Sequence, residues 1–176
     1  GFQGKYLVTA SIRRDGVSRF GADKRWGTFP AASVAWRISE ESFLKNSNVI
    51  SDLKLRASWG QNGNQDIGAF RYQTNIVPLS QGYYFGSNKL SSTTTYIPEN
   101  TPNPNLGWET SEQIDIGLDA AFLNSKLTVT LDWYEKLTKD WLVKAPVLGT
   151  TGASAPWING GDVKNTGLEF SLSWKD

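Results

Sequence analysis

The chain has 176 residues, enough for one ordinary domain, and carries 18 Lys and Arg against 17 Asp and Glu, a formal net charge of +1. This balance offers no broad basic field for nucleic acid, and no apolar run approaches the roughly 20 residues of a membrane-spanning helix. Cys, His and Met are absent, which excludes disulfides and Ser–His or Cys–His catalysis and argues against a zinc site, so we expect no metal and no cofactor. Because residue 1 is Gly and not Met, we expect the chain to be processed, trimmed or a fragment.

Side chains alternate between apolar and polar along six stretches, which predicts six β-strands and an all-β chain. In the stretch "LTVTLDWY", for example, Leu127, Val129 and Leu131 alternate with threonine and aspartate. Successive side chains of a strand point to opposite faces, so each strand has one apolar and one polar face. In chain order, the predicted strands are Tyr6–Arg13, Ala31–Ile38, Leu53–Gly60, Thr110–Phe122, Leu127–Tyr134 and Leu168–Lys175.

The connections between these strands alternate in length. "LNSK" is a tight turn, and "SEESFLKNSNVISD" is a short connection in which Ser39 is expected to cap a helical turn. The others are long, and one spans about 45 residues from Gln61 to Trp108, with "AFRYQTNIV" expected to be extended. Short turns at one end and long loops at the other are typical of an outer-membrane barrel.

Three loop motifs have a structural interpretation as well as a chemical one. "DGVSRFGAD" lacks the ligand spacing of a calcium loop, so we expect Phe20 to anchor it and Arg19 to pair locally. "GQNGNQ" lacks the Lys-Ser/Thr pair of a phosphate loop and is expected to be a turn. "NGGDVKNTG" is expected to turn the chain into its last strand.

Four blocks of the sequence, in this order, carry a family resemblance that covers nearly the whole chain. They are "SIRRDGVSRFGADKRWGTFPAASVAWRISEESFL", "LKLRASWGQNGNQDIGAFRY", "NPNLGWETSEQIDIGLDAAFLNSKLTVTLDWYEKLTKDWL" and "GDVKNTGLEFSL". Together they resemble the SusC-like TonB-dependent outer-membrane transporters of Bacteroidetes. Trp26 and Ala31 depart from the residues expected at those positions, Tyr and Ser.

The resemblance implies that residues 1–176 are a late segment of a transmembrane β-barrel, an antiparallel meander within about 22 strands, with the plug and the flanking strands outside the chain. It implies import of oligosaccharides or peptides across the bacterial outer membrane. The implied partners are a SusD-like surface lipoprotein, the TonB complex acting through the plug, the remaining barrel strands and outer-membrane lipid. The last residues, "SWKD", lack a terminal aromatic, so we expect further strands to follow.

Within this interpretation each strand has a lipid face and a lumen face. The lipid face is predicted to contain Ile114, Ile116, Leu118, Val129, Leu131, Trp133, Phe170 and Leu172. The lumen face is predicted to contain Gln113, Asp115, Asp119, Thr130, Asp132 and Glu169. We interpret these carboxylates as a polar wall and not as the acid pair of a glycosidase, so no catalytic residue is predicted.

Aromatic residues of the long loops are the candidates for substrate contact, because sugar C–H faces stack on aromatic rings. They are Tyr83, Tyr84, Phe85, Trp108, Trp141 and Trp157. We therefore predict a transport protein and not an enzyme. Two alternatives remain, a soluble all-β carbohydrate-binding module and a β-sandwich glycosidase. Either would cover the apolar rows with a second sheet.

Overall fold

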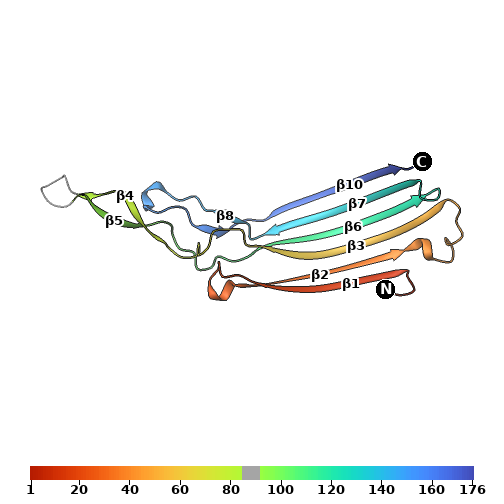
Figure 1. Cartoon of the computed structure of the whole chain (residues 1–176), viewed down its shortest axis with the longest axis horizontal. Coiled ribbons are helices and arrows are strands. Elements are labelled where there is room, and N and C mark those ends of the chain that lie inside the picture. Colours follow the sequence, from red (N-terminus) through yellow and green to blue (C-terminus); the bar gives the residue numbers. More distant parts are fainter. Residues whose placement is uncertain (85–91) are drawn as a thin grey trace.

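The computed structural model describes residues 1–84 and 92–176, with the side chains of residues 80–93 excepted. Its main element is one six-stranded antiparallel sheet with the strand order β1-β2-β3-β6-β7-β10 (Figure 1). The strands are β1 (Tyr6–Gly16), β2 (Trp26–Arg37), β3 (Ile50–Asn64), β6 (Glu109–Phe122), β7 (Leu127–Lys139) and β10 (Val163–Trp174). All six predicted strands are therefore confirmed, and the prediction of an antiparallel all-β fold is confirmed with them.

Two small hairpins extend the loops, β4 (Ile76–Tyr84) with β5 (Ser92–Pro98) and β8 (Leu142–Lys144) with β9 (Trp157–Asn159). Three short 3₁₀ turns complete the described structure: η1 (Ala22–Lys24), η2 (Ile38–Glu40) and η3 (Gly149–Thr151). Among the described residues, no helix is long and apolar enough to cross a membrane.

Two local predictions are wrong. The "GQNGNQ" segment is not a turn: Gly60 to Asn64 continue β3 and pair with β6 as far as Glu109. Its glycines permit this, because a Cβ on Gly63 would lie 2.1 Å from the Phe29 ring, which packs directly over the strand. The "AFRYQTNIV" segment is extended only from Ile76 onward, because the residues before it form turns.

Ser39 does not cap a helical turn, so this prediction is also wrong. It lies inside η2, whose N-cap is Arg37 and has no side-chain capping bond. Its hydroxyl instead donates a hydrogen bond of 2.7 Å to Asp52 at the start of β3. The side chain therefore ties the β2–β3 connection to the sheet.

The strand register separates the side chains into two faces that run across all six strands. One row of cross-strand partners is Val8, Val34, Ala57, Ile116, Trp133 and Leu168. The adjacent row, on the other side of the sheet, contains Thr9, Ser33, Ser58, Asp115 and Tyr134. We call these two sides the apolar face and the polar face.

The two ends of the sheet differ, as the connection lengths predicted. The β2–β3 and β6–β7 connections lie at one end together with both termini, and the long connections extend from the other end (Figure 1). At the first end, "LNSK" turns tightly with Leu123, Asn124 and Ser125 at positive φ. We call these the turn end and the loop end.

Candidate functional site: the polar face, the apolar face and the loop core

The centre of the polar face is a network of four charged side chains. The Arg56 guanidinium lies 3.2 Å from Asp119 Oδ2 and 2.6 Å from Asp132 Oδ1, so it bridges carboxylates of β6 and β7. Lys54 joins the network, with Nζ 2.9 Å from the same Asp119 oxygen. These ion pairs link β3, β6 and β7 on the side of the sheet opposite the apolar rows.

A glycine makes this network possible. Gly117 is the cross-strand partner of both Arg56 and Asp132, so it lies between them. A Cβ at Gly117 would lie 2.2 Å from Asp132 Oδ1 and 2.6 Å from Arg56 Cζ. The missing side chain leaves the space through which the guanidinium reaches across β6.

The register places all six residues predicted for the lumen on this polar face. Asp115 accepts hydrogen bonds from Gln113 (3.0 Å) and Ser58 (3.3 Å). Thr130 is the cross-strand partner of Asp119, and Glu169 is the partner of Asp132. Their contact with a lumen stays a prediction.

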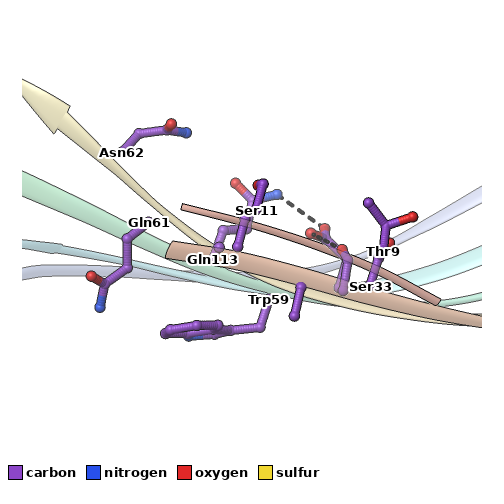
Figure 2. Close-up of a pocket in the computed structure, with 12 residues that line it drawn as sticks. Thr9, Ser11, Ser33, Trp59, Gln61, Asn62 and Gln113 are labelled. Carbon is purple, nitrogen blue, oxygen red and sulfur yellow. Dashed lines mark hydrogen bonds between the residues drawn. The ribbon is translucent and has the colours of Figure 1, made fainter. Parts of the chain in front are cut away.

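A shallow hollow of about 300 Å³ lies beside this network, over β1, β2 and β3. Figure 2 shows its labelled residues on both sides of the ribbon, with Gln61 and Trp59 leaving the sheet on the side opposite Asn62. The part on the polar face is lined by the small residues Thr9, Ser11, Ala31, Ser33, Ser58 and Gly60, together with Asn62, Gln113 and Asp115. A surface of hydroxyls and carboxylates without large side chains is suited to water and polar solutes.

The apolar face holds all eight residues predicted for lipid contact. Phe170 is 67% exposed, Leu172 61% and Leu131 45%. Among the described residues, the two other sheets are small hairpins of the long loops, and no second sheet covers these rows. This exposure is the opposite of what a sandwich requires, and it argues against both soluble alternatives.

At the turn end, the apolar face is bordered by a cluster around Glu41. The carboxylate accepts hydrogen bonds from Lys5 Nζ (2.9 Å), Tyr6 Oη (2.8 Å) and Trp36 Nε1 (3.2 Å). Tyr6 and Trp36 stack with ring centroids 6.4 Å apart. An aromatic body with a hydrogen-bonded polar tip is suited to the border between apolar and aqueous phases.

The Glu41 cluster should respond to acid. Hydrogen bonds from Lys5, then Tyr6 and Trp36, hold the pKa of Glu41 below its ordinary value of 4.5. A lowered pKa means that the cluster is intact above pH 4.5 and is lost as the pH falls through the lowered pKa. We expect an acid-induced change in Trp36 fluorescence below pH 4.5 in the full-length protein.

The change should be absent in Glu41→Gln and retained in Glu40→Gln, because Glu40 binds Arg37 and not the aromatic pair. An acid transition of the same size in Glu41→Gln would contradict the assignment.

The loop end carries a second core, which we call the loop core. Phe20, Ile67, Leu106 and Leu142 are buried against one another, so all three long connections contribute to it. Val17, Tyr72, Trp108 and Trp157 pack around them. Phe20 has no exposed surface, which confirms its predicted role as an anchor.

Polar side chains that are buried or half-buried hold the same loops together. The Asn159 side chain accepts a hydrogen bond from the Gly107 N–H (2.8 Å) and donates one to the Gly107 carbonyl (3.0 Å). The Glu109 carboxylate accepts a hydrogen bond from the Leu142 N–H at 3.0 Å. Arg19 donates to the Ile67 carbonyl at 2.8 Å and so bridges to the next loop; its predicted local pairing is wrong. The reason is that Ile67 and Phe20 are buried together, which brings their chains side by side.

The predicted substrate-contacting aromatics lie in different surroundings. Trp108 is partly buried, with Phe20 and Phe29 edge-on at 5.8 and 5.4 Å. Trp157 is partly buried below Lys144 Nζ (5.6 Å), whereas Trp141 is 48% exposed. The backbones of Tyr83 and Tyr84 belong to β4, and Phe85 lies outside the described residues. Substrate contact by these six residues stays a prediction.

Four residues of these sites were not predicted from the sequence: Lys54, Arg56, Glu109 and Asn159. The sequence pattern could have indicated Lys54 and Arg56, because they alternate with Leu53, Leu55 and Ala57 and therefore belong to the polar face. No sequence pattern indicated Glu109 or Asn159, because their hydrogen-bond partners come from distant loops. Within the described ranges, no group of three or more acidic side chains is placed to hold a metal ion.

A twisted antiparallel sheet with one exposed apolar face, one charged face, short turns and long loops is the wall of a β-barrel. The family model described as "TonB dependent receptor-like, beta-barrel" matches residues 1–175. The chain belongs to this family, and its resemblance to SusC-like receptors is confirmed. The predicted location, the bacterial outer membrane, is confirmed with it.

Two curated relatives and one solved structure illustrate the similarity. The chain is 43% identical to TonB-dependent receptor SusC of Bacteroides thetaiotaomicron, covering 97% of this chain and 17% of that protein. It is 41% identical to TonB-dependent receptor P39 of Formosa agariphila, covering 99% of this chain and 16% of that protein. It superposes on the RagAB peptide importer in a closed-closed state with a TM-score of 0.86 and 31% identity, over 98% of this chain and 18% of that one. The chain thus spans about a sixth of the length of the relatives it matches.

Proposed function

We propose that residues 1–176 form part of the barrel wall of a TonB-dependent outer-membrane importer, with the apolar face against lipid and the polar face against the lumen. The plug and the other strands of a barrel of about 22 strands would lie elsewhere in the protein. The observation that carries the proposal is the shape of the exposed apolar band on the sheet.

The band runs obliquely across the strands. Toward the turn end, the band stops at Tyr6 on β1. The cross-strand row of Tyr6 reaches β10 at Phe170. On β10, however, the band continues four residues beyond Phe170, to Trp174. Toward the loop end, the band stops at Leu168 on β10. The cross-strand row of Leu168 reaches β1 at Val8. On β1, however, the band continues four residues beyond Val8, to Ile12. Both borders are therefore displaced by the same amount in the same direction.

A flat membrane crossing tilted strands requires this displacement. Four residues correspond to about 13 Å along a strand, and five strand spacings to about 24 Å, which gives a tilt of about 30°. Membrane barrels tilt their strands by about 35–45°. A patch that covered another protein domain would not need two parallel oblique borders, so this geometry favours lipid as the neighbour.

The proposed cargo is an oligosaccharide or a peptide. A similar solved structure is titled a peptide importer, which supports a peptide. The oligosaccharide is the cargo implied by the resemblance to SusC-like transporters, and a similar protein is named SusC. The loop end, with its buried loop core and the exposed Trp141, would border the cargo cavity. A SusD-like surface lipoprotein and the TonB complex are the proposed partners, and no catalytic step is proposed.

Growth experiments test this function in the organism that encodes the chain. We expect deletion of the receptor gene and deletion of TonB to abolish growth on the same oligosaccharide or peptide source, with growth on its monomers unaffected. Restoring the full-length receptor should restore growth only when TonB is present. Two results together would contradict the proposal and favour a soluble binding module. The receptor would be recovered in buffer without detergent, and no nutrient source would fail to support growth of both deletion strains.

A further inference from the structure

The apolar face changes character at its loop end, where charged residues lie directly above the apolar band. We call them the loop-end belt: Arg14, Glu112, Glu135, Lys139 and Lys164. Lys139 Nζ lies 2.8 Å from Glu112, and Lys164 Nζ lies 2.9 Å from Glu135. Glu112 also accepts the Trp59 indole N–H at 2.8 Å. Both lysines of the belt are therefore neutralised by glutamates.

Arg14 differs from these lysines, because no carboxylate pairs with it among the residues that the structure describes. Its guanidinium lies over the Trp26 ring, with Cζ 5.0 Å from the ring centroid. Trp26 is 62% exposed and pairs across the strands with Gly16, where a Cβ would lie 2.8 Å from a ring carbon. Gly16 thus lets the indole lie against β1 and support the guanidinium from below.

A second arginine, Arg25, is the residue before Trp26 and lines the same hollow as the indole. Gly16, Val17, Ser18, Arg25 and Trp26 line a shallow hollow of about 380 Å³. Arg25 donates to the Phe20 carbonyl at 3.4 Å and has no carboxylate partner within the described ranges. The corner therefore combines an exposed indole with two guanidinium groups that have no carboxylate partner among the described residues. Ile12, two residues before Arg14 on the apolar face, is 75% exposed.

We propose that Arg14, Trp26 and Arg25 form a binding site for the phosphate group of an outer-leaflet lipid, whose acyl chains lie along the apolar face below. The inference rests on the proposed function, since it takes this face to be in the membrane. A guanidinium offers several N–H donors in a planar fork that matches phosphate oxygens, and stacking on an indole holds the fork in place. Indole rings are enriched at the level of lipid headgroups, where this corner lies.

The charge pattern selects this occupant. An apolar segment of another protein would leave both guanidinium groups unpaired, whereas a phosphate on an acyl chain satisfies the arginines and the exposed Ile12 together. The neighbouring Lys–Glu pairs carry no net charge, so the anion should bind at this corner of the belt.

Lipid binding by the full-length receptor in detergent tests the inference. The probes are lipid A carrying a phosphate and the same lipid dephosphorylated, titrated with detection by native mass spectrometry. We expect Arg14→Ala to weaken binding of the phosphorylated form about tenfold and to leave the dephosphorylated form unchanged. Lys164→Ala is the matched control, because it removes an exposed cation that already has a glutamate partner.

Equal binding of phosphorylated lipid by Arg14→Ala and the unsubstituted receptor would overturn the site. An equal loss of binding of the phosphorylated lipid in Lys164→Ala would also overturn the site. The site would likewise be overturned if Arg14→Ala lost binding to the surface lipoprotein while its lipid binding was unchanged. Membrane assembly of each variant, measured by resistance to unfolding in SDS without heating, tests the proposed function separately. A receptor that assembles normally but binds both lipids alike would refute only the phosphate site.

Discussion

Arginine in place of Leu131 is expected to destabilise the assembled protein by about 2–4 kcal/mol, the cost of a cation near the bilayer midplane on a barrel's lipid face. Leu131 lies in the middle of the apolar band, with Leu118 and Phe170 as its cross-strand partners. No carboxylate is opposite it on either neighbouring strand. The free energy of unfolding of the full-length protein in lipid, from a guanidinium titration, measures the effect.

Thr130→Arg is the matched control for this prediction. Thr130 is the adjacent residue of the same strand, on the polar face, with Asp119 and Ser171 as its partners. A new cation there meets a carboxylate and water, so we expect assembly to be nearly unchanged. Equal damage from the two substitutions would contradict the assignment of the faces.

Truncation of Phe20 to alanine is expected to cost about 3–5 kcal/mol of the stability of the loop core, as for other fully buried phenylalanines. Phe20 packs edge-on against Trp108 and joins three connections that are otherwise distant in the chain. Its loss should loosen all three while leaving the sheet intact. Hydrogen exchange in the full-length protein should therefore rise in residues 17–25, 65–72 and 140–162 and stay constant in β6 and β7.

Phe43→Ala provides the comparison, because Phe43 lies in the β2–β3 connection at the turn end and is 71% exposed. We expect it to leave loop exchange unchanged. An increase in hydrogen exchange confined to residues 17–25 in Phe20→Ala would contradict the prediction, because it would mean that the three connections do not form one cooperative unit.

The parts of the protein that depend on period-two alternation could be predicted from sequence. A strand sends neighbouring side chains to opposite faces whatever its partners are, so "LTVTLDWY" specified which residues share a face before any pairing was known. The same reasoning placed Asp119 and Asp132 on the polar face and Phe170 on the apolar face. The short "LNSK" connection likewise implied antiparallel neighbours, which β6 and β7 are.

Contacts between segments far apart in the chain could not be predicted in this way. The extension of β3 through "GQNGNQ" depends on Phe29 of another strand covering Gly63, and a glycine-rich segment by itself favours a turn. Arg19 was expected to pair within its loop, yet it binds the Ile67 carbonyl, because the buried Phe20 beside it draws the two loops together.

Sequence alone therefore determined the strands, their two chemically distinct faces and the alternation of short and long connections, because these follow from local side-chain periodicity and chain length. Only the tertiary structure decided the oblique course of the apolar band, the passage of Arg56 over Gly117 and the joining of three loops around Phe20. Each of these depends on strand register or loop packing, and both are set by pairing between residues that no local pattern connects.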